Sequence, residues 1–262
     1  MTLAVSLRVP DGLVIAADSL STTRGEIGIQ GEFKGQCPAC KKDIQLKDIK
    51  FPPLPIPSSV SSYAQKVFAY KEHYGIATYG MAILNEKTIY YHVKLLEQID
   101  SSNEKAVVTK IAKKLMEYFH GEIKKQFKDI DKAPDTFKPL GFLIVGYDNE
   151  IGKTIEIHIG KKPNIEERIG SGCTIGGDIA VASNLWEIGK KDPRLSTKYA
   201  SFSLQDAVDY AEYLINTTAK FQRFANMIPT VGGEVDIALI TPYKKFTWIK
   251  CKKLTKILEL DK

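Results

Sequence analysis

Short stretches of the chain carry apolar residues at the two-residue spacing of β-strands or in compact apolar runs. The first two stretches are joined by Pro10-Asp11-Gly12, which is typical of a turn, so a hairpin is predicted at the start of the chain. A period of two is also visible further on, where Val67 alternates with Ala69 and Tyr74 with Ile76. The predicted strands are Val5–Leu7, Leu13–Ala17, Lys66–Tyr70, His73–Gly80, Gly141–Tyr147, Thr154–Ile159, Val235–Thr241 and Phe246–Cys251.

Other segments carry apolar residues three or four positions apart, which predicts amphipathic helices. One such helix is expected from about Ala82 to Ile99, and a second starts near Asn103. A third is expected over Asp178–Ile188. A fourth begins at Ser203, where Ser203-Leu-Gln-Asp forms an acidic variant of a capping box.

The order of these elements predicts a layered α/β (α+β) protein. Strands, two helices, strands, two helices and final strands follow one another, and each helix pair needs a sheet face to cover its apolar side. Short connections favour antiparallel strands. Between about 26 and 64 the pattern is lost and prolines cluster, so an irregular inserted loop is predicted there. We therefore predict one domain over residues 1–262 with this loop inserted.

Composition excludes several classes of protein. Apolar residues make up 44% of the 262 residues and charged residues 26%, which suits a globular core. The net charge of +6 comes from lysines spread along predicted helices and without interleaved aromatic residues, so no nucleic-acid partner is expected. No apolar run is long enough to cross a bilayer, and no signal peptide is visible, so a cytoplasmic location without a membrane partner is expected.

Thr2 is the residue that most directly suggests chemistry. It opens the predicted hairpin, which would hold the chain terminus in a sheet, although chain ends are usually loose. A threonine hydroxyl is a weak nucleophile, and a free α-amine on the same residue can act as its base. Removal of Met1 would expose that amine. The alternative is that Thr2 is simply an early residue of an edge strand.

The opening segment resembles the mature start of proteasome β-type subunits, which are N-terminal threonine hydrolases. The shared features are a threonine, an Asp-Gly turn, and Ala-Ala-Asp closing the second strand, with Asp18 sixteen residues after Thr2. The order of elements is similar to the four-layer αββα sandwich of N-terminal nucleophile hydrolases, with two antiparallel sheets flanked by helix pairs. The resemblance implies that Thr2 is the nucleophile and that Asp18 orients a nearby cation.

Two lysines compete for the role of that cation. Lys34 lies thirty-two residues after Thr2, which equals the spacing of the family. Lys66 instead matches by context, because it opens a strand and Gly80 ends the next strand fourteen residues later. We choose Lys66, which makes the irregular segment an insertion. In the resemblance, the backbone N–H of Gly80 contributes to the oxyanion hole.

Three weaker matches complete the expected site. Ser171, in Gly170-Ser-Gly, resembles the serine of a turn before the third helix that shares protons with the α-amine. Thr22 would pair with the substrate backbone, and Thr78 would line the specificity pocket. The sequence also departs from the family, which has an acid and a serine where Ile228 and Val231 stand here. Thr230 or Asn226 are candidates to replace those polar groups.

The function that the resemblance implies is hydrolysis of peptide bonds by an N-terminal threonine peptidase. Peptides or unfolded proteins would be the substrates, identical subunits would form a ring or related assembly, and an unfoldase or cap is a further partner. A catalytically impaired structural subunit and an amidase acting on a small amide are the alternatives. No cofactor and no catalytic metal are expected.

The cysteines leave one question open. Four cysteines do not form a disulfide framework in a cytosolic chain of this size, and Cys173 and Cys251 lie in predicted core segments. Cys37-Pro-Ala-Cys40 resembles one knuckle of a zinc ribbon, although structural zinc has four ligands. The pair is either a half-site completed by a second subunit or an inert loop.

Overall fold

The computed structural model describes residues 2–27, 30–50, 54–100 and 107–252. The described chain divides into two compact units. The larger unit contains the residues up to Ser21 and from Ser61 onward, and the smaller unit is Thr22–Val60. Met1 lies outside the described residues, as do the expected start of the second helix near Asn103 and part of the proline cluster.

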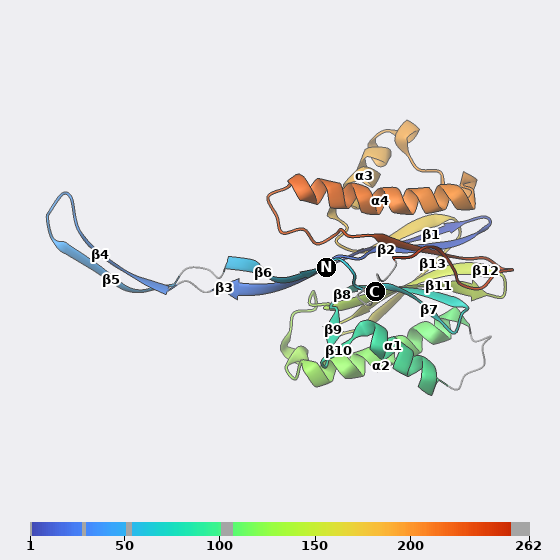
Figure 1. Ribbon diagram of the computed structural model, residues 1–262, viewed down its shortest axis with the longest axis horizontal. Helices are drawn as coiled ribbons and strands as arrows, with labels where there is room; N and C mark the ends of the chain where they lie inside the picture. The colour runs from blue at the N-terminus through green and yellow to red at the C-terminus, as the bar shows by residue number, and fades with distance from the viewer. Residues whose placement is uncertain (1, 28–29, 51–53, 101–106, 253–262) are drawn as a thin grey trace, which may run out of the picture. The chain divides into compact units, whose positions relative to one another are not determined.

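The first sheet of the larger unit has five antiparallel strands in the order β14-β1-β2-β15-β16 (Figure 1). The predicted N-terminal hairpin is confirmed, with Leu7 opposite Val14 near its centre and Ala4 opposite Ala17 at its open end. On the other side of β1, Leu3 is opposite Gly177. The strands are β1 Leu3–Val9, β2 Gly12–Asp18, β14 Gly172–Gly177, β15 Val235–Ile240 and β16 Thr247–Lys250.

The second sheet also has five antiparallel strands, in the order β13-β12-β11-β8-β7. These strands are β7 Val67–Tyr70, β8 Tyr74–Gly80, β11 Leu140–Asp148, β12 Ile151–Ile159 and β13 Asn164–Ile169. The two sheets pack face to face through a buried cluster that includes Ala4, Ala17, Ala77 and Leu143. Small side chains at this interface let the sheets approach closely.

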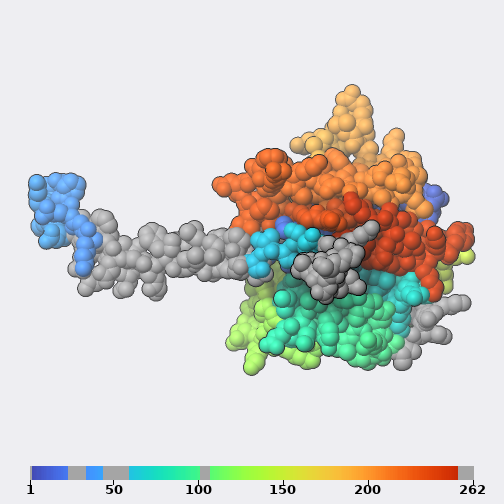
Figure 2. Space-filling model, viewed as in Figure 1, coloured from blue at the N-terminus to red at the C-terminus, as the bar shows by residue number. Residues whose placement is uncertain are grey.

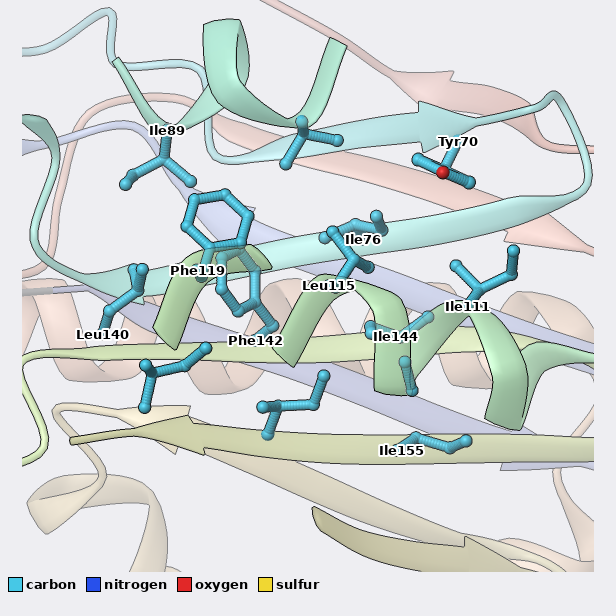
Figure 3. Close-up of a cluster of buried hydrophobic side chains, with 14 of the residues drawn as sticks. Tyr70, Ile76, Ile89, Ile111, Leu115, Phe119, Leu140, Phe142, Ile144 and Ile155 are labelled. Atoms are coloured by element: carbon cyan, nitrogen blue, oxygen red, sulfur yellow. The ribbon is translucent and has the colours of Figure 1, made fainter. Parts of the chain in front are cut away.

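A helix pair covers the outer face of each sheet. α1 (Ile89–Ile99) and α2 (Val108–Gln126) cover the second sheet, where Leu115 and Phe119 pack against Phe142 (Figure 3). α3 (Ala180–Lys191) and α4 (Leu204–Phe224) cover the first sheet. The two helix pairs therefore lie on opposite faces of the larger unit, α3 and α4 in orange and α1 and α2 in green (Figure 2). The predicted four-layer αββα sandwich is confirmed.

Local features explain where the helices begin. The capping box predicted at Ser203 is present, since its hydroxyl accepts from Asp206 N–H and the Asp206 carboxylate accepts from Ser203 N–H. The prediction that the first helix starts at Ala82 was wrong. Two short strands, β9 (Ile83–Leu84) and β10 (Lys87–Thr88), come first, and Thr88 caps α1. Short 3-10 helices complete the unit: η1 Ile130–Lys132, η2 Pro193–Leu195 and η3 Tyr199–Ser201.

The smaller unit consists of paired strands. β4 (Gln30–Gln36) pairs with β5 (Asp43–Lys50), and β3 (Ser21–Ile27) pairs with β6 (Leu54–Ser61). The prediction of irregular backbone across this segment was therefore wrong: the prolines of β6, which had suggested a loop, lie in a paired strand. Among the described residues, no helix has both the length and the apolar character needed to cross a membrane.

Candidate active site

Asp18 is the centre of the candidate site. It ends β2, and the register that places Ala17 opposite Ala4 brings its carboxylate to the start of β1. Asp18 Oδ1 accepts a 3.1 Å hydrogen bond from Leu3 N–H, and Oδ2 accepts from the N–H groups of Leu20 and Gly232 at 3.1 and 3.0 Å. The carboxylate is 1% exposed, so these donors replace the water that burial removes.

Lys66 completes the coordination of that carboxylate. Its ammonium lies 3.0 Å from Asp18 Oδ1 and also donates to the carbonyl oxygen of Leu20. The residue precedes β7 and is held there because its own carbonyl accepts from Thr78 N–H at 3.0 Å. Burial lowers the pKa of the Lys66 amine, and the Asp18 carboxylate opposes that shift. Burial likewise raises the pKa of Asp18, opposed by Lys66 and by the backbone donors.

Lys66 and Asp18, both predicted as site residues, are therefore in direct contact. The contact also reaches the amide that links Thr2 to Leu3, because one oxygen of Asp18 serves both Leu3 N–H and Lys66 Nζ. Lys34, the competing lysine, lies on β4 in the smaller unit. The catalytic role of Lys66 remains a prediction.

Thr2 is held by the strand on the other side of β1. Its side chain and backbone are 3% exposed, and its carbonyl oxygen accepts a 2.7 Å hydrogen bond from Asp178 N–H. Gly177, with φ +92°, permits this approach, since a Cβ there would lie 1.9 Å from the Thr2 carbonyl oxygen. The segment that contacts Thr2 is thus Gly177-Asp178, at the end of β14.

A polar network extends from Asp178 that the sequence did not predict. Asp178 Oδ2 accepts from the hydroxyl of Thr230 at 2.5 Å and from the amide of Gln222 at 3.0 Å. Gln222 Oε1 in turn accepts from the N–H groups of Thr230 and Val231 at 2.9 and 3.0 Å. Gln222 and Thr230 are 1% and 0% exposed, so this network is buried beside the start of β1.

The family has polar residues at the positions of Ile228 and Val231, and the network shows what stands near these positions here. Val231 is 2% exposed and packs in the apolar cluster beneath α4, so it contributes no polar side chain. Ile228 is half-buried and Asn226 is exposed. Thr230, one of the two candidate replacements, is the residue that joins Asp178. The sequence signal for Asp178 was its place between two glycines and the third helix.

Ser171 does not lie near Thr2, so its predicted role in proton transfer was wrong. It occupies the turn between β13 and β14, and Gly172 is opposite Arg8, at the far end of β1. A strand rises about 3.3 Å per residue, which puts Ser171 roughly 20 Å from Thr2. The error arose because β14, lying between the Gly-Ser-Gly turn and the helix, was not recognised as a strand.

The remaining predicted residues lie on β8 and β3. Gly80 ends β8 with φ +94°, and a Cβ there would lie 2.3 Å from the Pro139 carbonyl oxygen, so only glycine fits. Its neighbour Tyr79 lies against Gly177, which brings this end of β8 to the region of Thr2. Thr78 is buried, and its hydroxyl donates to the Gly141 carbonyl at 3.4 Å. Thr22 lies on β3 and is half-buried.

A second buried ion pair lies beside the first. Asp236 follows Val235, which is opposite Asp18, and its carboxylate accepts from the ammonium of Lys252 and from Lys252 N–H at 2.9 Å. The two side chains are 1% and 2% exposed. After burial and Asp18, the charge of Lys252 also lowers the pKa of Lys66, while Asp236 raises it. The two charges of this pair therefore shift the pKa of Lys66 in opposite directions.

The αββα sandwich of this chain is a proteasome-like fold. One solved structure that this chain resembles is Anbu (ancestral beta-subunit) from Yersinia bercovieri, with a TM-score of 0.54. The alignment covers 94% of this chain and 86% of that chain at 14% sequence identity, so the likeness concerns the fold. No protein-family model and no curated protein matches the sequence.

Proposed function

We propose that this chain is an N-terminal threonine hydrolase that cleaves peptide bonds, with Thr2 as the nucleophile. One observation carries the proposal: the Asp18 carboxylate joins the Lys66 ammonium to the Leu3 amide, one residue from Thr2. A buried cation at this place has a chemical use, because it favours the neutral, basic form of a nearby α-amine and stabilises a developing alkoxide.

The proposed reaction starts from a chain whose first residue is Thr2. The α-amine accepts the hydroxyl proton while the oxygen attacks the carbonyl carbon of the substrate, forming a tetrahedral intermediate. The N–H of Gly80 would stabilise the oxyanion. The proton then passes to the leaving amine, the C–N bond breaks, and an ester to Thr2 remains. A water molecule hydrolyses that ester and restores the hydroxyl.

Asp178, Gln222 and Thr230 would supply the polar support that Ile228 and Val231 do not. Asp178 holds the Thr2 carbonyl through its N–H, and its carboxylate is fixed by Thr230 and Gln222. A carboxylate near an α-amine raises the pKa of that amine, whereas an ammonium lowers it. The balance between Asp178 and Lys66 would set the pH at which the base is active.

We further propose that the chain works as a homo-oligomeric ring or related assembly in the cytoplasm. Peptides or unfolded proteins would be its substrates, and an unfoldase or cap would deliver them. A compact hydrolase that exposed such a site freely would cleave unrelated proteins, which is the reason for enclosing it. Thr22 and Thr78 would contact the substrate.

The decisive experiment compares three purified forms of the chain by intact mass and by hydrolysis of peptides with different end groups. The wild type should lack Met1 and cleave at least one peptide. Thr2→Ala should lose hydrolysis, because alanine keeps the α-amine but lacks the attacking oxygen, whereas Thr2→Ser should retain part of it. Undiminished cleavage by Thr2→Ala, with light scattering showing intact assembly, would refute the threonine mechanism.

A catalytically impaired structural subunit is the second candidate. The apolar packing of Val231 and the distance of Ser171 from Thr2 favour it, since both positions lack the polar group that the family uses. This candidate predicts an assembly that forms with Thr2 as the first residue and yet cleaves no peptide. The same three proteins therefore distinguish the two functions.

A further inference from the structure

A tight turn joins β4 to β5 (Figure 1), and the residues of this turn include Cys37 and Cys40. The last strand pair before the turn is Gln36 opposite Asp43. Inside it, Cys37 N–H donates to the Lys42 carbonyl and Lys41 N–H donates to the Cys37 carbonyl, both at 2.8 Å. These bonds fix the backbone on both sides of the two cysteines, so the turn holds them in place.

The same turn directs hydrogen-bond donors at the first sulfur. The N–H groups of Cys40 and Ala39 and the thiol of Cys40 face the Cys37 sulfur. Lys41 adopts the left-handed φ of 60°, which is uncommon for a lysine and turns the backbone around the sulfur. Because both cysteines belong to this one turn, it presents two possible metal ligands together.

One copy of the chain supplies only half of a structural zinc site. Zinc held by cysteines takes four ligands in tetrahedral geometry. Segment 22–60 contains no further cysteine and no histidine, and all histidines of the chain follow residue 60. Among the residues that the structure describes, no group of three or more potential ligand side chains is present. This turn therefore offers two of the four ligands, and a second molecule can supply the other two.

We propose that Cys37 and Cys40 of two copies of this chain together bind one zinc ion. A two-fold axis through the metal would give each copy the same environment, as closed dimers require. Four thiols would each release a proton to solvent on binding, so the ion with four thiolates carries two negative charges. Lys41 and Lys42, both exposed beside the cysteines, would offset that charge. The proposal is independent of the proposed hydrolase function.

A second copy is favoured over another partner by the symmetry of the ligand set. Each copy offers two cysteines in one turn, so two copies complete the four-ligand set, and the lysines beside them more than balance its negative charge. A Cys37–Cys40 disulfide would use the same sulfur atoms, but its formation requires an oxidant. Experiments on reduced protein therefore distinguish a metal site from a disulfide, because the disulfide cannot form without an oxidant.

The first test measures metal content of the reduced, chelator-stripped full chain after addition of Zn²⁺ alone and dialysis. We expect about 0.5 zinc ions per chain, and with Co²⁺ an absorption spectrum of tetrahedral sulfur coordination. Cys37→Ser with Cys40→Ser should lose the metal. Cys251→Ser, which removes an exposed cysteine elsewhere, is the matched control and should keep it. One zinc per chain, or no zinc, would overturn the shared site.

The second test asks whether the metal joins two chains. Wild-type chains with two different tags are mixed, and co-purification is compared with Zn²⁺ and with chelator. We expect zinc-dependent pairing that the Cys37→Ser, Cys40→Ser variant loses. A ring formed through the larger unit would also join the two tagged chains, but the cysteine substitutions would not affect it. Co-purification in the presence of chelator measures this baseline. An equal zinc-dependent increase in pairing for the variant, or a metal load without any such increase in the wild type, contradicts the proposal.

Discussion

The N–H of Asp178 donates a 2.7 Å hydrogen bond to the carbonyl oxygen of Thr2. This bond ties the first described residue of the chain to the segment that leads into α3. The carboxylate of Asp178 accepts from Thr230 and Gln222, so Asp178 contacts both Thr2 and the polar network. Asp178 is thus the residue in contact with Thr2 on this side of β1. The resemblance to the family had suggested Ser171 for a place near Thr2.

Asp178→Asn tests this replacement. The substitution keeps the backbone bond to Thr2 but removes the charge that Thr230 and Gln222 hold. Because a hydrogen bond to a charged group contributes about 1.5–3 kcal/mol, we expect kcat to fall roughly 10- to 100-fold. Steady-state hydrolysis of a small peptide is the measurement. Ser171→Ala is the control and should leave kcat unchanged; an equal loss in both variants would contradict the assignment.

The Asp18–Lys66 ion pair is expected to have both a structural and a catalytic role. Lys66→Met leaves the Asp18 carboxylate buried without its cation, and the free energy of unfolding should fall by about 3–5 kcal/mol. Adding Asp18→Asn removes the unpaired charge, so part of that stability should return. Hydrolysis should stay lost in the double variant. Chemical denaturation and peptide cleavage, measured together, separate the two roles, and recovered hydrolysis would show that Lys66 acts only on stability.

Gly177 is expected to accept no side chain. Its φ of +92° is unfavourable for alanine, and the added Cβ would collide with the Thr2 carbonyl. We expect Gly177→Ala to lower the free energy of unfolding by about 1–3 kcal/mol and to abolish hydrolysis. Gly121→Ala is the matched control, because nothing lies within 4 Å of its Cβ in α2. That variant should be stabilised by up to about 1 kcal/mol in the same denaturation experiment.

The cysteines should differ in reactivity when the protein is reduced and metal-free. Burial raises the pKa of the Cys173 thiol to about 12, against the opposing charge of Arg8. The Cys173 thiol is then almost wholly protonated at pH 8, whereas the lowered pKa of Cys37 favours its thiolate. We expect an alkylating reagent to modify Cys37 first and Cys173 last. Peptide mass mapping over time gives the order, and early labelling of Cys173 would contradict it.

The sequence predicted the fold better than the site. The hairpin, the helix stripes and the capping box at Ser203 depend on local patterns, and the structure contains them. β14 was missed because Gly-Cys-Thr-Ile-Gly-Gly has few apolar residues and three glycines. That omission displaced the expected serine and hid Asp178. Gln222 could not be found either, since a buried glutamine on a helix has no sequence pattern that marks it.

The burial of Thr2 has a consequence for the order of events during synthesis. Any enzyme that frees the α-amine of Thr2 has to reach a residue that is 3% exposed once β1 is paired on both sides. The partner β14 is made late, and at about 5–20 residues per second the ribosome takes roughly 10–35 s to reach Gly177 after Leu3. Processing of the terminus therefore has a time window that translation speed sets, and slower synthesis would lengthen it.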